Sequence, residues 1–240
     1  MSRKDKEALL AHLEELDRRR TFNKFQYLYP ETGPLSRHNY PKHLEFFRLG
    51  ATHNERALFG GNRSGKSFAG SYEDVCHLTG LYPDWWEGHR FNRPVDGWSC
   101  GDIGKTLRDI LQTTLLGPPG KPDLEGSGMI PRDLIVRTTP RVGTADAVES
   151  IFVKHVSGGV STLQFKAYEQ GRAAFQGTSQ DFIHLDEECP LEIYTECLLR
   201  TMTVNGIIYL TATPLLGLTD LMLAFLPHLA PAPEIKEPLH

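Results

Sequence analysis

The feature that most constrains what this chain can fold into is the stretch GGNRSGKS at residues 60–67. It matches the pattern G-x-x-x-x-G-K-[ST], in which backbone N–H groups of a glycine-rich loop cradle phosphates. In that pattern the lysine reaches the terminal phosphates and the last hydroxyl holds Mg²⁺, so Lys66 would act on the reacting phosphate and Ser67 would bind the metal. We therefore predict a phosphate site made of Gly60, Gly61, Asn62, Arg63, Ser64, Gly65, Lys66 and Ser67.

The segments around this loop are typical of an α/β fold. An apolar run over 56–59 predicts a buried strand that enters the loop. The pattern over 65–78 predicts a helix whose N-terminal N–H groups and dipole favour an anion. Residues 94–102 predict a strand that ends in a glycine turn, and apolar runs at 182–185 and 206–214 predict further strands. With 240 residues, 40% of them hydrophobic, we expect one large domain and no second full domain.

The middle of the chain predicts more irregular structure. Residues 105–116 predict a helix, and the prolines and glycines of 117–133 predict an exposed loop that is mobile or contacts a neighbour. Two strands are expected at 134–139 and 151–156. The SGG sequence at 157–159 predicts a hairpin after the second of them.

The first 55 residues precede the strand that enters the loop. Lys4–Arg20 predicts an amphipathic helix with a leucine stripe, which more often docks on its own domain than on a partner. Residues 21–55 are rich in aromatic side chains, and a nucleotide base needs cover from outside the phosphate loop. The candidates for base contact, or alternatively for core anchors, are Tyr40, His43, Phe46 and Phe47.

Charge, cysteines and hydropathy limit the class of protein. The net charge of −4 means that any nucleic-acid contact must come from local patches. The four cysteines show neither C-x-x-C nor zinc-finger spacing, which favours reduced thiols in a cytosolic compartment. No stretch is apolar and long enough to span a membrane, and the charged N-terminus lacks the apolar core of a signal peptide. We expect a soluble intracellular protein.

Three acidic residues follow the strand predicted at 182–185. Ionised carboxylates at the end of a buried strand are costly unless a cation or an active-site role offsets them. Asp186 is the expected Mg²⁺ ligand, and Glu187 the residue that positions the attacking water. Glu188 would support the site or begin the next helix, and capping of that helix by all three acids is the structural alternative. The separation from Lys66, 186 − 66 = 120 residues, favours an additional-strand NTPase over a compact nucleoside kinase.

The apolar strand at 206–214 ends in the sequence TATP. Its polar tip would emerge at the same sheet edge as the loop and the carboxylates, because ligands bind at the C-terminal ends of parallel strands. Thr211 and Thr213 are therefore candidates to sense the γ-phosphate by hydrogen bond, although threonine is also an ordinary strand residue.

Three blocks in order, GGNRSGKS, FIHLDEE and TATP, with GRAAFQG before the second, resemble the ATPase domain of the tailed-bacteriophage terminase large subunit over about residues 40–225. The resemblance implies a P-loop NTPase of the additional-strand, catalytic-glutamate type, with a central, mostly parallel sheet flanked by helices. It implies an ATP- and Mg²⁺-dependent motor that threads viral double-stranded DNA into a procapsid in the host cytoplasm. The implied partners are further copies in a homo-oligomeric ring, the portal protein and the small terminase subunit.

The resemblance also implies residue roles. Arg63 is similar to a family arginine that contacts phosphate, and TATP looks like the motif that couples hydrolysis to movement. Arg172 in GRAAFQG is the candidate for an arginine that reaches a neighbouring subunit's nucleotide, and pairing with a local carboxylate is the alternative. His43 stands where many members have an adenine-reading glutamine, which is a departure from the family pattern.

The domain organisation follows from these motifs. We expect a helix and base-proximal segment at 1–55, the ATPase core at 56–227, and at 228–240 the start of a linker to a nuclease domain that this chain lacks. The isolated chain is then expected not to cut DNA. Three alternatives stay open: a helicase-like nucleic-acid translocase, a ring-assembly module that binds ATP with little turnover, and a small-molecule kinase.

Overall fold

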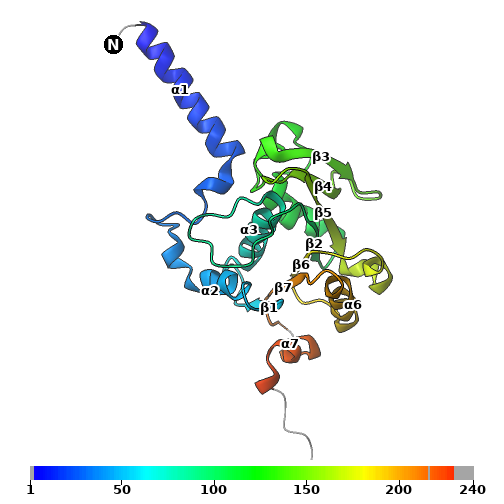
Figure 1. The fold of residues 1–240 in the computed structure, drawn as a ribbon. Coiled ribbons are helices and arrows are strands. Elements are labelled where there is room, and N and C mark those ends of the chain that lie inside the picture. The colour runs from blue at the N-terminus through cyan, green and yellow to red at the C-terminus, as the bar shows by residue number, and fades with distance from the viewer. Residues whose placement is uncertain (1–2, 216, 230–240) are drawn as a thin grey trace, which may run out of the picture.

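A seven-stranded sheet forms the centre of the fold (Figure 1) in the order β1-β7-β6-β2-β5-β4-β3. This computed structural model describes residues 3–215 and 217–229. The pairs from β1 to β5 in that order are parallel, and β4 is antiparallel to both β5 and β3. In chain order, the strands are β1 (Glu55–Phe59), β2 (Asp96–Gly101), β3 (Ile135–Pro140), β4 (Val148–Lys154), β5 (Val160–Ala167), β6 (Phe182–Asp186) and β7 (Ile207–Ala212).

The structure contains a helix at each position that the sequence predicts, 4–20, 65–78 and 105–116. A single π-helical turn joins α4 to α5, so that 104–116 is one helical stretch, as expected. Short 3-10 turns occur at Lys24–Tyr27, Arg37–Asn39, Pro122–Leu124, Arg132–Leu134, Tyr168–Gln170, Arg172–Phe175 and Pro227–Leu229. The α-helices are α1 (Arg3–Phe22), α2 (Pro41–Leu49), α3 (Lys66–Thr79), α4 (Gly104–Leu107), α5 (Thr113–Leu116), α6 (Leu191–Met202) and α7 (Asp220–Phe225).

Strand β7 is inserted between β1 and β6, although it follows both of them in the chain. Its Leu210 pairs with Ala57 of β1 and with Leu185 of β6, both in parallel register. The additional strand of the fold is therefore β7, while the 120 residues between the two motifs supply β2 to β5. Because parallel neighbours end at the same edge, the loop after β1, the acids after β6 and the TATP sequence meet there.

Alternating side chains of the central strands build one core on each face of the sheet. Phe182 and Tyr209 pack with α2, α3 and the 104–116 helical stretch. Ile183 and Leu210 face the other way and pack with α6 and α7. Strands covered on both faces read as nearly continuous apolar runs, which explains the uninterrupted IIYL and FI sequences.

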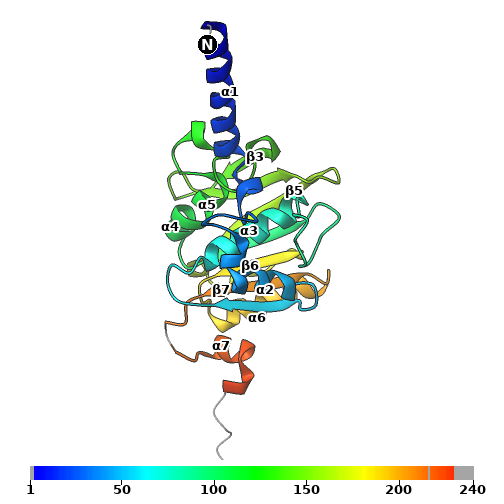
Figure 2. The same cartoon turned by 90° about the vertical axis from the view of Figure 1, so that its left-hand side faces the viewer.

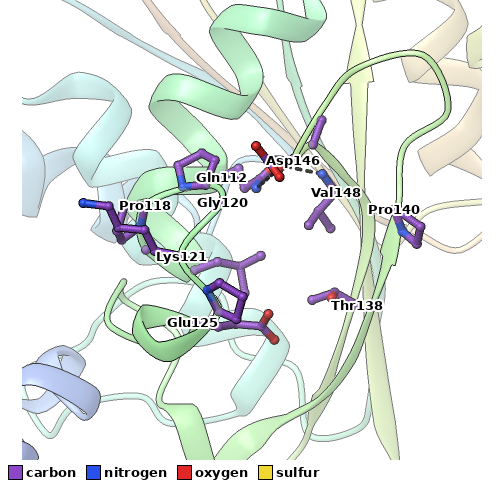
Figure 3. A pocket seen from close by; sticks show the side chains of 14 residues that line it. Gln112, Pro118, Gly120, Lys121, Glu125, Thr138, Pro140, Asp146 and Val148 are labelled. Carbon is purple, nitrogen blue, oxygen red and sulfur yellow. Dashed lines mark hydrogen bonds between the residues drawn. The ribbon is translucent and has the colours of Figure 1, made fainter.

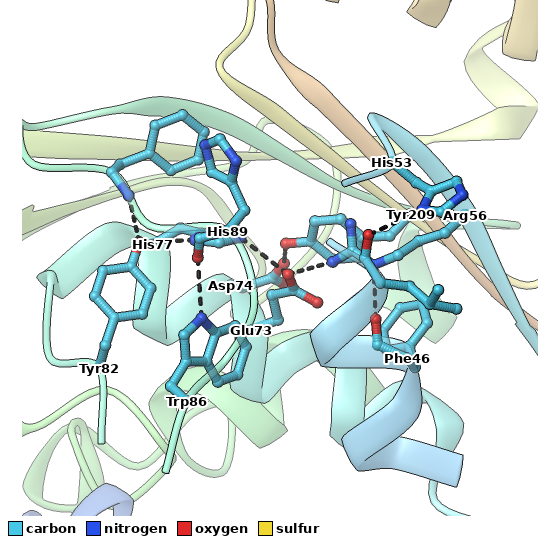
Figure 4. Close-up of polar contacts among 12 residues, drawn as sticks. Phe46, His53, Arg56, Glu73, Asp74, His77, Tyr82, Trp86, His89 and Tyr209 are labelled. Atoms are coloured by element: carbon cyan, nitrogen blue, oxygen red, sulfur yellow. Dashed lines mark hydrogen bonds and ion pairs between the residues drawn. The ribbon is translucent and has the colours of Figure 1, made fainter. Parts of the chain in front are cut away.

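A buried ion pair joins β1 to α3 (Figure 4). Arg56 donates to the Glu73 carboxylate and, through Nε, to the Phe46 carbonyl at 3.0 Å. Glu73 also lies 3.2 Å from Nε2 of His77. Burial alone would raise the pKa of Glu73, but Arg56 and His77 hold it below its usual value. The Arg56 guanidinium also stacks over the Tyr209 ring at 5.0 Å, so this pair ties β1, β7 and α3 together.

Replacing Arg56 tests this tie. We expect Arg56→Met to lower the free energy of unfolding by about 3–5 kcal/mol, because Glu73 would be left buried without its cation. The double variant Arg56→Met with Glu73→Met should lose less than the sum of the two single variants. Lys42→Met, which breaks the exposed pair with Glu45, is the control and should cost at most about 1 kcal/mol in urea unfolding. A loss for Arg56→Met no larger than that for Lys42→Met would contradict the account.

The expectation that α1 docks on its own domain is wrong. The helix projects away from the sheet (Figures 1 and 2), and Leu9, Leu13 and Leu16 are 47, 52 and 37% exposed. The physical reason is that the leucine stripe is narrow and flanked by charges that pair within the helix, as Glu15 does with two arginines. The helix meets the domain near its end, where the Arg132 guanidinium lies 3.5 Å from the Phe22 ring centroid.

The loop over 117–133 is irregular, as predicted, but its second half is buried. Met129 and Ile130 are 1 and 0% exposed, and their N–H groups donate to the carbonyls of Thr114 and Leu115 at 2.8 and 2.9 Å. The expected exposed excursion is therefore wrong for this half, because two large apolar side chains anchor it in the core.

The first half of the same loop borders a cavity of about 230 Å³ opposite β3 and β4 (Figure 3). Gln112 fixes the β3–β4 turn there, since its amide donates to the Asp146 carbonyl and accepts from the Val148 N–H, both at 2.9 Å.

Of the linker expected at 228–240, residues 230–240 lie outside the described part of the chain.

Candidate active site

The glycine-rich loop 60–67 connects the end of β1 to the start of α3. The Gly60 N–H donates to the Ala212 carbonyl of β7 at 3.3 Å, which fixes the start of the loop to the inserted strand. Gly65 has a φ of +81°, and a Cβ there would approach Cε1 of His43 to 3.1 Å. Glycine is thus required at this position both by the left-handed backbone and by the close approach of an imidazole.

Alanine at this position should destabilise the domain. We expect Gly65→Ala to cost about 1–2 kcal/mol of stability without nucleotide, because an L-residue is strained in this conformation. Gly61→Ala is the matched control within the same loop, since a Cβ there meets no atom within 4 Å, and it should change stability by about 0.5 kcal/mol or less. Thermal unfolding of both variants measures the difference, and equal losses would contradict the assignment.

Lys66 is buried and turned toward the end of β7. Its Nζ donates to Thr213 Oγ1 at 2.8 Å and to the Gly61 carbonyl at 3.0 Å. These neutral oxygens satisfy two of the three ammonium donors, and the lysine head lies within the loop that the sequence assigned to phosphate. An arriving phosphate would offer charged acceptors in their place, which are stronger partners for an ammonium.

Glu187 lies at the end of β6 with its backbone in the left-handed region, at a φ of +63°. Its N–H donates to the Thr211 carbonyl at 2.8 Å, and its carboxylate accepts from the Thr213 N–H at 3.1 Å. A non-glycine residue in this conformation carries strain that the surrounding contacts must outweigh. Thr213 therefore touches both Lys66, through its hydroxyl, and Glu187, through its backbone.

Glu188 does not belong to this arrangement. Its carboxylate accepts a hydrogen bond from Thr219, whose hydroxyl also accepts from the Met222 N–H and caps α7. The alternative that the three acids cap the following helix is also contradicted, because α6 begins at Leu191 after Pro190.

Asp186 is 6% exposed, and its Oδ1 accepts a hydrogen bond from the Thr211 hydroxyl at 2.6 Å. No Lys or Arg in the described chain forms a salt bridge with it. A carboxylate here and the Ser67 hydroxyl at the start of α3 are oxygen donors of the kind Mg²⁺ prefers together with phosphate oxygens. Within residues 3–215 and 217–229, no three His, Cys, Asp or Glu side chains gather as a metal cluster.

Thr211 differs from the expectation that it senses the γ-phosphate. It is fully buried, and its hydroxyl is engaged by Asp186 and by Nε2 of His184 at 2.9 Å. Its side chain therefore acts on the carboxylate beneath the site, whereas Thr213 lies at the loop.

A cavity of about 400 Å³ opens beside the loop, with Arg63, Ser64 and Gly65 on one side. Aromatic and apolar side chains, including Tyr40 and Phe68, form the rest of its wall. Its size and composition are those of a small-molecule site, and its place beside the loop suits a nucleotide base.

His43 joins this cavity to the loop. Its Nε2–H donates to the Ser64 carbonyl at 3.1 Å and its Nδ1 accepts from the Tyr29 hydroxyl at 2.8 Å, which is the pattern of a neutral imidazole. Burial lowers the pKa of His43, in agreement with that form. Phe46 and Phe47, also named as base candidates, are buried in the core instead, at 3 and 1% exposure.

Arg172 pairs with a local carboxylate in this structure. Its Nε lies 3.0 Å from Oε2 of Glu196 on α6, and its side chain is 53% exposed. Glu196 is 2% exposed and also pairs with Arg200 at 3.0 Å, so its charge keeps a partner if Arg172 leaves. The short turn that carries Arg172 is held by Lys166, which donates to the Ala174 carbonyl at 2.6 Å.

The fold and this site define the chain as a P-loop NTPase of the additional-strand, catalytic-glutamate class. A family model described as "Terminase large subunit, T4likevirus-type, N-terminal" matches residues 57–237, and the chain belongs to this family. The resemblance drawn from the sequence blocks is thereby confirmed.

One relative agrees with the family assignment, and solved structures are similar to this chain in fold. The terminase large subunit of Salmonella phage P22 is 36% identical over 204 residues, which cover 78% of this chain and 41% of that protein. The chain thus spans less than half the length of this relative. The large terminase of a thermophilic bacteriophage shares the fold at a TM-score of 0.50 and 12% identity, over 71% of this chain and 38% of that one. A structure of the same terminase in complex with ADP gives 0.49 and 12% identity, over 72 and 37% of the chains.

Sequence reasoning missed the polar residues beneath the site, above all Asp74 and His184. The available signal was a histidine inside the otherwise apolar strand FIHL and an aspartate on a helix face that has to be buried.

The four cysteines are buried and free, as expected, and burial raises the pKa of the Cys76 and Cys100 thiols. No helix in the described residues has the length and apolar character to cross a membrane.

Proposed function

We propose that this chain is the Mg²⁺-dependent, ATP-hydrolysing domain of a motor that packages viral double-stranded DNA into a procapsid. The observation that carries the proposal is the position of Thr213, which bonds to the phosphate-loop lysine and to the carboxylate of Glu187. Membership of the terminase large subunit family supports the packaging role, since the chain matches the N-terminal part of that protein.

Each residue has a task in this proposal. The loop N–H groups and Lys66 bind the β- and γ-phosphates and stabilise their charge. Glu187 orients the attacking water and accepts its proton. Ser67 and Asp186 would hold Mg²⁺, which when bound neutralises charge on the β- and γ-phosphate oxygens. Arg63, which lines the cavity that would take the base, would contact phosphate.

The coupling step would begin at Thr213. When Lys66 donates to a bound phosphate instead, the Thr213 hydroxyl loses its contact with Lys66. The Thr213 N–H still donates to the Glu187 carboxylate. A shift of the backbone at the end of β7 would then move Glu187 and the segment after TATP, where Glu188 accepts a hydrogen bond from Thr219 at the start of α7. In this way a change of bound nucleotide would change the position of the chain that follows the TATP sequence.

Arg172 would act on the nucleotide of a neighbouring copy. Its half-exposed side chain can leave Glu196 without stranding a buried charge, because Arg200 stays in place. The proposed assembly is a homo-oligomeric ring on the portal protein in the host cytoplasm, with the small terminase subunit recognising DNA. The net charge of −4 agrees with DNA contact through local patches of a ring rather than through a broadly basic face.

Phosphate release from ATP tests the proposal across a wide range of protein concentration. We expect activity per chain to rise with concentration, Glu187→Ala to lose it by about 10²-fold or more, and Arg172→Ala to lose about 10³-fold. A mixture of the two variants should regain activity that neither has alone, because one supplies the arginine and the other the glutamate. Arg93→Ala is the matched control, since Arg93 is similarly exposed and also pairs with a buried carboxylate, that of Asp181.

Other outcomes would exclude parts of this proposal. Activity that is linear in concentration and indifferent to Arg172→Ala would contradict the role of Arg172 across subunits. ATP binding without phosphate release at any concentration would contradict hydrolysis and favour a ring-assembly module.

A further inference from the structure

A row of polar side chains crosses the sheet beneath the site, on the face that α3 covers. Ser99 of β2, His184 of β6 and Tyr209 of β7 are register partners in three neighbouring strands. All three contact the carboxylate of Asp74 on α3, at 3.1, 3.0 and 2.5 Å respectively. All four residues are fully buried.

The row continues toward the C-terminal ends of the strands and reaches Asp186, the proposed metal ligand. Thr211 donates its only hydroxyl hydrogen to Asp186 Oδ1 at 2.6 Å, so its oxygen is an acceptor toward Nε2 of His184 at 2.9 Å. The other ring nitrogen, Nδ1, faces Asp74 at 3.0 Å. One chain of hydrogen bonds therefore runs from α3 through His184 and Thr211 to the carboxylate of Asp186.

Gly70 provides independent evidence that the fold is built around this imidazole. The residue lies in the interior of α3, where alanine is ordinarily more stable than glycine by about 0.5–1 kcal/mol. A Cβ on Gly70 would, however, lie 2.2 Å from Nε2 and 2.4 Å from Cε1 of His184. The second glycine of the GKSFAG sequence thus makes room for His184 against the helix backbone.

We propose that His184 is a positioning residue for the metal, acting through Thr211 on Asp186. His184 fixes the Thr211 hydroxyl, and that hydroxyl occupies Oδ1 of Asp186 and sets the direction in which the other carboxylate oxygen faces the nucleotide site. Groups that orient a ligating carboxylate typically contribute about 10–100-fold to metal affinity. This inference rests on the proposed function, which assigns Asp186 to Mg²⁺.

A core-packing role alone does not account for these contacts. A buried imidazole between two polar partners is costly unless its hydrogen bonds are made, and an apolar side chain would fill the same strand position without that cost. Asp74 accepts from Tyr209 and Ser99 and also pairs with Nδ1 of His184 at 3.0 Å. That pair accounts for one ring nitrogen of His184, whereas the other, Nε2, contacts Thr211 at 2.9 Å.

The test is binding of a fluorescent ADP analogue, first in EDTA and then in a Mg²⁺ titration. We expect Thr211→Val to bind the ADP analogue in EDTA with an affinity within about twofold of the unaltered chain. The Mg²⁺ concentration that gives half of the full increase in binding should be about 10-fold higher for this variant. Thr211→Ser keeps the hydroxyl and should stay within about twofold of the unaltered chain. Thr201→Val removes a buried hydroxyl on α6 and controls for general destabilisation.

Two further variants test His184 itself. His184→Leu should shift the Mg²⁺ dependence as Thr211→Val does, and the double variant should be no worse than either, because both act through one chain of hydrogen bonds. Gly70→Ala keeps every hydrogen-bonding group but takes the space of the imidazole, and it should shift the Mg²⁺ dependence in the same direction. This variant tests the inference even if Thr211→Val does not fold.

The outcomes separate this inference from the proposed function. Failure of the unaltered chain to bind the analogue more tightly with Mg²⁺ would overturn the assignment of the metal site. A normal response in the unaltered chain, together with an equal response in folded Thr211→Val, His184→Leu or Gly70→Ala, would overturn the positioning role alone.

Discussion

The pairing of β7 with β1 on one side and β6 on the other is the interaction on which the rest of the structure depends. It brings three strand ends to one edge, and each end carries a different part of the site. Thr213 follows β7 directly and therefore lies between Lys66 and Glu187. A chain with the same loop and carboxylates but without the inserted strand would have nothing between the phosphate lysine and the glutamate.

The same arrangement explains why polar residues lie under the sheet face that carries α3. The helix begins at the phosphate loop, so its direction is set by the loop, and Glu73 and Asp74 are carried inward with it. Buried carboxylates need partners, and the sheet supplies Arg56 to Glu73, and His184 and Tyr209 to Asp74. The layer that stabilises α3 on the sheet is therefore continuous with the layer that orients Asp186.

Most of the fold was predictable from sequence because its strongest signals are local. The loop pattern, the apolar strands and the acids after β6 each depend on a few neighbouring residues, and all of them appear where expected. The place of β7 in the sheet order could not be read from the 120-residue separation, because strand order is set by pairing rather than by distance in the chain.

The errors and omissions concern tertiary contacts. The leucines of α1 have the spacing of a docking face, yet nothing in the sequence says whether a partner surface exists. Phe46 and Tyr40 look alike as base candidates, but only Tyr40 borders the cavity. His184 and Asp74 lie 110 positions apart in the sequence, so no local sequence pattern predicts their contact.

The most direct test of the account is a crystal structure of the chain with Mg²⁺, ADP and a γ-phosphate mimic. We predict that Lys66 leaves Thr213 Oγ1 for the phosphates, while the Glu187 carboxylate keeps the Thr213 N–H and faces the γ position. Ser67 and Asp186 should both lie at the metal. A nucleotide outside the 60–67 loop, or Lys66 still 2.8 Å from Thr213 with the nucleotide bound, would contradict the central role of Thr213.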